Sequence, residues 1–234
     1  MILSKLFNRQ ISLDLSNLTD CHSHILPGVD DGVQSMEEAL EILSAYEEMG
    51  IREVWLTPHI MEDVPNTPQG LNERFQELTQ AYTGPIRLHL AAEHMIDNAF
   101  MPRLEAGEVM PHGRHKNMLL VETSYFNPPL QFEDTLKRVK SKGYFPILAH
   151  PERYRYILDL AGYRHLKNLG VKFQLNLLSL SGMYGREAAA KARDMLKNNM
   201  YDFVGSDIHT SMQLDPLRHL AVTRSQSEAI RATV

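Results

Sequence analysis

The sequence predicts an α/β protein whose parallel strands close into a compact β/α barrel, for three reasons. Short apolar runs typical of strands alternate with longer amphipathic runs typical of helices. The chain has 234 residues, 43% of them hydrophobic, which is enough for one large core. It contains no low-complexity tract and no linker long enough to separate two domains. We therefore expect one domain over residues 1–234, with a doubly wound open sheet as the alternative architecture.

Seven predicted strands follow one another along the chain. They are short segments that span residues 17–22, 52–57, 86–92, 118–122, 144–149, 171–175 and 202–206. Because helical patterns separate most of them, we expect the strands to lie parallel. At this chain length a β/α barrel, complete or incomplete, is the simplest closure.

The predicted helices are amphipathic runs between these strands. Ser35 and Glu38 form the Ser-x-x-Glu pattern of a capping box, apolar residues follow at helical spacing, and Gly50 ends the pattern. Further patterns cover residues 71–82, 132–142, 158–169 and 186–198, and a weaker one lies in the C-terminal segment.

Composition excludes several classes of protein. The formal net charge of -5 leaves no broad basic surface, which argues against a nucleic-acid partner. The single cysteine, Cys21, rules out an internal disulfide and fits a reducing compartment. No apolar run approaches the roughly 20 residues that span a bilayer, and the first residues lack the features of a signal peptide. We therefore expect a cytoplasmic protein that does not span a membrane, and its oligomeric state stays open.

Ionisable side chains follow six of the seven predicted strands, at the point where each strand ends. They are His22, His24, His59, Glu93, Glu122, His150, Asp207 and His209. Because the carboxyl ends of barrel strands share one face, we expect these side chains to meet in one pocket. The turn that Pro27, Gly28 and Gly32 allow would bring Asp31 to the same place.

These residue types indicate a metal site. The two imidazoles of His22-Ser-His24 fall on one side of an extended segment and can bind one cation. Imidazoles combined with carboxylates suit Mn, Fe or Zn. Nine ligands are too many for one ion, whereas two or three ions that share a bridging carboxylate would use them all. Close metal pairs recur in enzymes that displace phosphoryl groups.

Several motifs are similar, in order and spacing, to those of the PHP (polymerase and histidinol phosphatase) superfamily. They are His22-Ser-His24, Val29-Asp-Asp-Gly32, Thr57-Pro-His59, Ala149-His-Pro-Glu-Arg-Tyr154 and Gly205-Ser-Asp-Ile-His209. The sequence most resembles the bacterial metal-dependent tyrosine-protein phosphatases of capsule and exopolysaccharide operons, the CpsB and YwqE type. The resemblance covers about residues 18–210. It leaves residues 1–17 as an N-terminal extension and 210–234 as a C-terminal tail.

The resemblance implies a distorted (β/α)7 barrel with two or three divalent metal ions. The metal is expected to be Mn, with Fe or Zn as alternatives. The implied ligand sets are His22, His24, Glu93 and Asp207 for the first ion, Glu93, Glu122 and His150 for the second, and Asp31, His59 and His209 for the third.

The resemblance also implies an activity, the hydrolysis of phosphotyrosine in proteins. Arg153 matches the family arginine that holds the substrate phosphate, a task that suits a guanidinium. A hydroxide that bridges two metals would attack the phosphorus, with Arg153, His22, His24 and Glu93 as the catalytic residues. The implied partner is a bacterial tyrosine kinase, and the implied role is regulation of capsular or exopolysaccharide synthesis.

Two alternative functions stay open. A small-molecule phosphoesterase, such as a histidinol phosphatase, would use the same metals, and a non-catalytic metal-binding interaction protein would keep the ligands without turnover. Cys21 is no thiol-phosphatase nucleophile, because Pro27 stands where the arginine of a Cys-x5-Arg loop would be. The family often has a second arginine after the last Asp-x-His, and here Arg218 is the candidate for that role. Tyr125 and Phe126 are predicted to pack within a loop, with contact to an aromatic substrate as the alternative.

Overall fold

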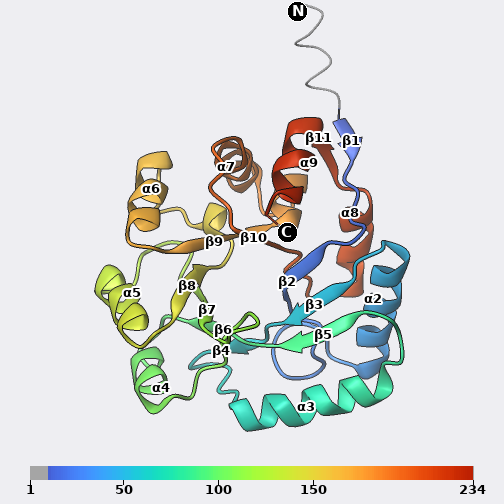
Figure 1. The fold of residues 1–234 in the computed structure, drawn as a ribbon, viewed down its shortest axis with the longest axis horizontal. Coiled ribbons are helices and arrows are strands. Elements are labelled where there is room, and N and C mark those ends of the chain that lie inside the picture. The colour runs from blue at the N-terminus through green and yellow to red at the C-terminus, as the bar shows by residue number, and fades with distance from the viewer. Residues whose placement is uncertain (1–9, 234) are drawn as a thin grey trace, which may run out of the picture.

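Residues 10–233 are described by a computed structural model (Figure 1). The first nine residues of the predicted N-terminal extension, and Val234, lie outside the described part. Strands and helices alternate over most of the described chain, as the sequence predicts. No helix in this part is long and apolar enough to cross a membrane.

Parallel strands form two sheets in residues 10–233. One sheet has the strand order β2 (Thr19–Ser23), β3 (Glu53–Leu56) and β5 (Arg87–Leu90). The other has the order β10 (Phe203–Gly205), β9 (Lys172–Asn176), β8 (Phe145–Leu148), β7 (Met118–Glu122), β6 (Glu93–Met95) and β4 (His59–Ile60). Each of the seven predicted strand segments overlaps one of these strands, so the prediction of a parallel α/β fold is confirmed.

The two sheets are continuous along the chain, because β3 leads into β4 and β5 leads into β6. Pro58, which lacks a backbone N–H, lies in the first interruption. The Thr57 N–H still donates to the Ser23 carbonyl at 2.8 Å, and the Asp207 N–H donates to the His22 carbonyl at 2.8 Å. The second bond places the end of β10 beside β2, so the strands curve into a half-barrel.

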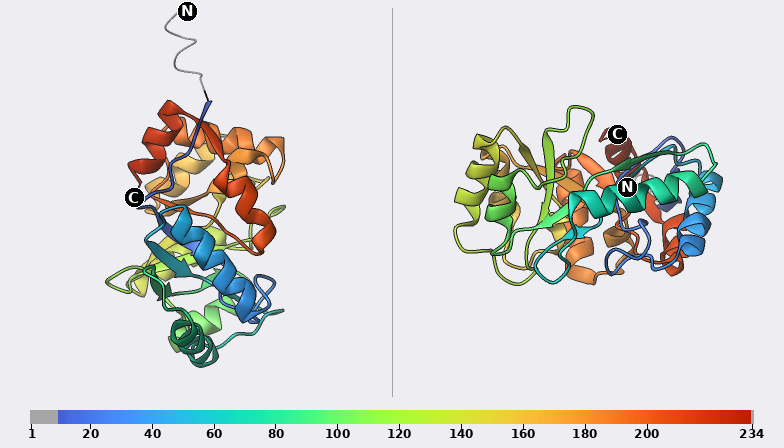
Figure 2. Two further views of the ribbon diagram at one scale, coloured as in Figure 1. Left: turned by 90° about the vertical axis from the view of Figure 1, so that its right-hand side faces the viewer. Right: turned by 90° about the horizontal axis from the view of Figure 1, so that it is seen from below.

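Helices occupy the connections between successive strands and lie outside them (Figures 1 and 2). They are α2 (Met36–Glu48), α3 (Pro68–Ala81), α4 (Phe100–Ala106), α5 (Phe132–Ser141), α6 (Leu160–Asn168) and α7 (Arg186–Lys197). The Ser35 hydroxyl accepts a hydrogen bond from the Glu38 N–H at 3.1 Å, as the capping pattern predicts. The short helix α4 gives no amphipathic signal in the sequence, since it has seven residues and Pro102 is one of them.

The C-terminal segment packs against the beginning of the described chain. It contains α8 (Leu214–Arg218), β11 (Ala221–Thr223) and α9 (Arg224–Arg231). Strand β11 pairs antiparallel with β1 (Gln10–Ser12), and Ile11 lies opposite Val222. Arg231 also forms an ion pair with Asp14. This short antiparallel pair joins segments that lie far apart in the sequence.

Tyr46 connects helix α2 to the two strands that carry candidate ligands. Its side chain is fully buried, and its hydroxyl lies 2.9 Å from Asp20 Oδ2 and 2.8 Å from Ser206 Oγ. Asp20 in turn accepts a hydrogen bond from the Ser206 N–H at 2.8 Å and one from the His22 N–H at 3.2 Å. These bonds fix the backbone at His22 and just before Asp207.

Candidate metal centre

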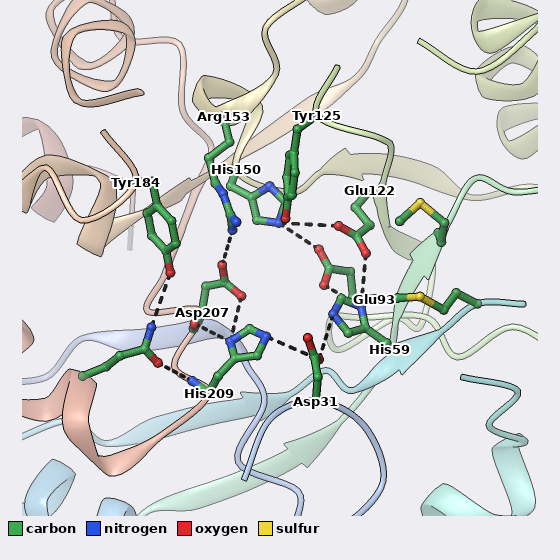
Figure 3. Close-up of a pocket in the computed structure, with 13 residues that line it drawn as sticks. Asp31, His59, Glu93, Glu122, Tyr125, His150, Arg153, Tyr184, Asp207 and His209 are labelled. Atoms are coloured by element: carbon green, nitrogen blue, oxygen red, sulfur yellow. Dashed lines mark hydrogen bonds and ion pairs between the residues drawn. The ribbon is translucent and has the colours of Figure 1, made fainter. Parts of the chain in front are cut away.

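The nine predicted ligands lie together at the carboxyl ends of the strands, beside a pocket of about 440 Å³, and Figure 3 shows the seven that line it. Those that line the pocket are Asp31, His59, Glu93, Glu122, His150, Asp207 and His209. His22 and His24 are fully buried and approach Glu93 and Asp207 from behind the lining. The structure therefore brings all nine residues into one cluster.

Glu93 lies at the centre of this cluster. Its Oε2 lies 3.2 Å from His22 Nε2, 3.4 Å from His24 Nε2 and 3.2 Å from His59 Nδ1, and its Oε1 lies 3.1 Å from His150 Nε2. In the described structure this Oε2 is buried and has no hydrogen-bond partner. A buried carboxylate oxygen that faces three imidazoles in this way fits a bound cation, which would satisfy it.

Asp207 and Glu122 stand on either side of Glu93 in the pocket wall. Asp207 Oδ1 lies 3.5 Å from His22 Nε2 and 3.4 Å from His24 Nε2. Glu122 Oε1 lies 3.1 Å from His59 Nδ1. Each of the three carboxylates therefore shares imidazole neighbours with another, which is the arrangement that neighbouring ions require.

Asp31 extends the cluster toward solvent. Its Oδ1 lies 3.5 Å from His59 Nε2 and 3.7 Å from His209 Nε2, while 71% of its side chain is exposed. The turn after His24 thus brings Asp31 back to the pocket, as the sequence predicts.

Among the described residues, four overlapping groups offer three or four ligand atoms that all lie within 4.8 Å of one another. They are His24, Asp31, His59 and His209; His22, His24 and Glu93; His22, His150 and Asp207; and His59, Glu93 and Glu122. Because the groups share residues, the donors form one continuous cluster. This grouping by distance differs from the three sets that the resemblance implies.

Asp30 and Gln174 orient the imidazoles from behind. His24 Nδ1 donates to Asp30 Oδ2 at 2.8 Å, and the same oxygen accepts the His59 N–H at 3.0 Å. His22 Nδ1 donates to Gln174 Oε1 at 2.9 Å, and that oxygen accepts the His150 N–H at 3.1 Å. These bonds place the Nδ1 proton outside the cluster and leave Nε2 of His22 and His24 free to bind a cation. The sequence predicts no role for either residue, although Asp30 adjoins Asp31.

The backbone is strained or crowded where ligands are positioned. His150 and Asp207 both adopt the left-handed region, with φ of 31° and 53°. Gly205 passes so close to β2 that a Cβ there would lie 2.6 Å from His22 Cβ. A Cβ on Gly32 would likewise lie 2.5 Å from His24 Cβ. Glycine is therefore required at both positions for the loops to reach the histidines.

Opposite charges determine the protonation of the cluster. Burial lowers the pKa of His22, but the carboxylates of Glu93 and Asp207 outweigh burial and raise it to about 9. Burial raises the pKa of Glu93, yet the neighbouring imidazoles hold it well below its usual range. Glu93 is therefore ionised at neutral pH and available as a ligand, and cation binding would displace protons from the imidazoles.

Arg153 lies in the pocket between two tyrosine rings (Figure 3). Its guanidinium carbon lies 4.4 Å from the ring centre of Tyr125 and 4.1 Å from that of Tyr184. One terminal nitrogen donates to Asp207 Oδ2 at 2.9 Å. Burial lowers the pKa of Arg153, but Asp207 outweighs burial and raises it, so the side chain stays charged. Stacking on both faces and one ion pair fix the plane of the guanidinium.

Tyr184 and Gln213 also line the pocket, and the sequence gives no signal for either. Gln213 Oε1 accepts the His209 N–H at 2.6 Å, and its Nε2 lies 3.5 Å from the Tyr184 hydroxyl. Tyr125 also lines the pocket and is thus available to a substrate, whereas Phe126 is 61% exposed and stacks on Arg155.

Two residues considered from the sequence lie away from the pocket. Arg218 donates to Glu48 at 2.9 Å on the surface and is not among the residues that line the pocket. It therefore does not take the place of a second phosphate-binding arginine. Cys21 does not line the pocket either, and burial raises the pKa of its thiol, which is unsuited to a nucleophile.

A half-barrel of parallel strands with clustered histidines and carboxylates beside a fixed arginine is typical of a metal-dependent hydrolase. Comparison with known proteins is more specific. The chain belongs to the family described as capsular polysaccharide synthesis, CpsB/CapC, whose model matches residues 18–226. The matched range runs beyond residue 210 and includes much of the predicted C-terminal tail.

The relatives include named tyrosine phosphatases. The chain is 29% identical over 197 residues to tyrosine-protein phosphatase YwqE of Bacillus subtilis (strain 168). The aligned region covers 82% of this chain and 77% of that protein. The chain is also 27% identical over 202 residues to tyrosine-protein phosphatase CpsB of Streptococcus pneumoniae, which covers 82% and 83%. A crystal structure from work on these two proteins also matches, and that work describes them as unique metal-dependent tyrosine phosphatases. The match has a TM-score of 0.78 and 26% sequence identity, and it covers 92% of this chain and 85% of the other.

Proposed function

We propose that the protein is a metal-dependent protein-tyrosine phosphatase that acts in capsular or exopolysaccharide synthesis. The observation that carries this proposal is the fixed guanidinium of Arg153 beside the His and carboxylate cluster, in one pocket. A phosphate group is recognised by such a combination of positive charges. The relatives named above are tyrosine-protein phosphatases, and the description of the family names capsular polysaccharide synthesis.

We assign the nine clustered residues as ligands of two or three divalent ions, with Mn as the expected metal and Fe or Zn as alternatives. The unpartnered, buried Oε2 of Glu93 supports Glu93 as the bridging ligand. When bound, the ions supply positive charge for the phosphate oxygens and make a water molecule acidic enough to act as a nucleophile near neutral pH. His22, His24 and Glu93 would serve catalysis as ligands.

Arg153 would bind and orient the phosphate. Asp207 and the rings of Tyr125 and Tyr184 hold its plane in place, and its other N–H groups can donate to two phosphate oxygens at once. Because these contacts exist before substrate binds, little rotamer entropy is lost on binding. The tyrosine leaving group, with a pKa of about 10, departs more readily than an alkoxide.

The finer architecture belongs to the same proposal. We infer a distorted (β/α)7 barrel of the PHP type, in which β3 with β4 and β5 with β6 each count as one strand. The bond between Asp207 and His22 supports closure between β10 and β2.

The proposed physiological substrate is a phosphorylated bacterial tyrosine kinase, and the proposed location is the cytoplasm. The names of the relatives support phosphotyrosine in proteins as the substrate class. The single cysteine fits a reducing compartment.

Phosphate release from a phosphotyrosine peptide tests the proposed function. Protein treated with a chelator is assayed with and without added Mn²⁺, with histidinol phosphate as the control substrate. Turnover that Mn²⁺ restores, and that favours the peptide, is expected. Preference for histidinol phosphate would assign the protein to the small-molecule phosphoesterases instead, and failure to hydrolyse either substrate would favour a binding role.

A further inference from the structure

Exposed hydrophobic side chains gather on the catalytic face. In residues 10–233, seven large hydrophobic side chains are exposed, and five of them follow the carboxyl ends of β7, β8, β9 and β10. These five are Phe126, Leu130, Leu158, Met183 and Met212. Leu130 and Leu158 are 95% and 82% exposed, so both side chains are open to contact with a partner.

Leu158 borders a second cavity, of about 690 Å³, between the first turns of α5 and α6. We call it the α5–α6 groove, and its apolar lining includes Pro128, Pro129, Phe132, Tyr156, Leu158 and Leu166. Leu130 lies in the loop between Pro129 and Gln131, two residues that line the groove. All three acidic residues of the lining already have partners, since Glu133 pairs with His165, Asp134 pairs with Lys137, and Asp159 accepts two backbone N–H groups at the start of α6. The groove therefore suits an apolar side chain more than a charged one.

A stack of three tyrosines joins this groove to the catalytic pocket. Tyr125 lines the pocket, Tyr156 lines the groove, and Tyr154 is buried between them. The ring centres lie 6.0 Å apart from Tyr125 to Tyr154 and 5.4 Å apart from Tyr154 to Tyr156. An extended peptide advances about 3.3 to 3.6 Å per residue, so about three or four residues are enough to cover both steps even if the three ring centres lie in line.

We propose that the α5–α6 groove is a docking site for the protein substrate. It binds an apolar side chain of the same polypeptide that carries the phosphotyrosine, about three or four residues away from it. This inference rests on the proposed function and adds that the enzyme recognises sequence around the phosphotyrosine. The groove is assigned to the substrate rather than to another partner because it lies close to the catalytic pocket, two ring-to-ring steps of 6.0 and 5.4 Å from Tyr125.

Binding and turnover of matched peptides test the docking site. The probes carry a non-hydrolysable phosphonate analogue of phosphotyrosine, with one leucine or one serine three or four residues before or after it. Affinity is measured by fluorescence anisotropy on the Mn²⁺-loaded protein, and turnover is measured with the phosphotyrosine forms and with p-nitrophenyl phosphate. The wild-type protein should prefer one leucine peptide by about tenfold, since burial of a leucine side chain has roughly this effect.

The variant L130S/L158S should lose this preference but hydrolyse p-nitrophenyl phosphate at the wild-type rate. Phe145, which is 46% exposed at the beginning of β8 and thus at the opposite end of the strand, gives the control F145S, which should keep the preference. Equal affinity of the wild-type protein for the leucine and serine peptides, with normal turnover, would overturn the docking site alone. Absence of phosphonate binding and of turnover would overturn the proposed function with it. The wild-type protein and F145S could also self-associate while L130S/L158S does not, with the peptide preference the same in all three. That result would assign the groove to a second copy of the chain.

Discussion

Asp30 and Gln174 each use one side-chain oxygen to fix two parts of the cluster. Gln174 Oε1 accepts both the His22 imidazole N–H and the His150 backbone N–H, so the ring of one ligand and the chain position of another depend on one amide. Eight of the nine proposed ligands could be predicted because they stand where predicted strands end, and Asp31 because a turn brings it back to them. The sequence gives no sign of Gln174, which lies inside a strand where only the folded neighbours reveal its role.

Replacement of Gln174 by methionine keeps the size of the side chain but removes the acceptor. We expect Gln174→Met to weaken Mn²⁺ binding by about 10-fold to 100-fold, because the His22 ring loses its orientation. Titration calorimetry on chelator-treated protein measures the affinity. Gln76, exposed on α3, provides the control Gln76→Met, which should bind metal normally. Unchanged affinity in Gln174→Met would mean that the His22 ring is held by other contacts.

Arg153→Lys keeps the positive charge but loses the planar fork and the stacking on two rings. We expect kcat/KM for a phosphotyrosine peptide to fall by about 100-fold, with metal content unchanged. Arg155→Lys is the matched control, since Arg155 is exposed and stacks only on Phe126. Wild-type kinetics in Arg153→Lys would show that Arg153 does not hold the phosphate.

At the scale of elements, periodicity predicts the strands and the longer helices well. The predicted strand at residues 118–122 coincides with β7, and the predicted helix at 186–198 nearly coincides with α7. Two interruptions of strands are not predicted: one separates β3 from β4, and the other separates β5 from β6. They depend on how the neighbouring strands accommodate Pro58 and the change of direction after β5. The pairing of β1 with β11 is not predicted either, since each strand has only three residues and its partner lies at the other end of the chain.

Tyr46 connects α2 to β2 and to the segment after β10. Removal of its hydroxyl group tests that connection. Tyr46→Phe should lower the free energy of unfolding by about 1 to 3 kcal/mol, because buried Asp20 and Ser206 lose a partner. Ser44→Ala removes an exposed hydroxyl from the same helix and should change stability by less than about 0.5 kcal/mol. Both are measured by urea denaturation. Equal stabilities of the two variants would contradict the role given to Tyr46.

At the scale of the whole molecule, the fold brings together proposed ligands that span residues 22 to 209 of the chain. The convergence could be predicted, since parallel strands of a β/α fold place their carboxyl ends on one face. The distances that make Glu93 the centre of the cluster could not, because they depend on the curvature of the two sheets and on the turns after β8 and β10. The positions of Tyr184 and Gln213 likewise depend on loops that have no periodic signal.

The Glu93 cluster is proposed to hold the metal ions that drive phosphotyrosine hydrolysis. The most direct measurement adds Mn²⁺ stepwise to chelator-treated protein and records bound metal by mass spectrometry together with phosphate release from a phosphotyrosine peptide. In the wild-type protein, activity should rise with bound metal up to two or three ions per chain. Glu93→Gln should stay folded, bind less metal and hydrolyse almost no peptide. Full activity in protein that holds no metal, or in Glu93→Gln, would contradict the account.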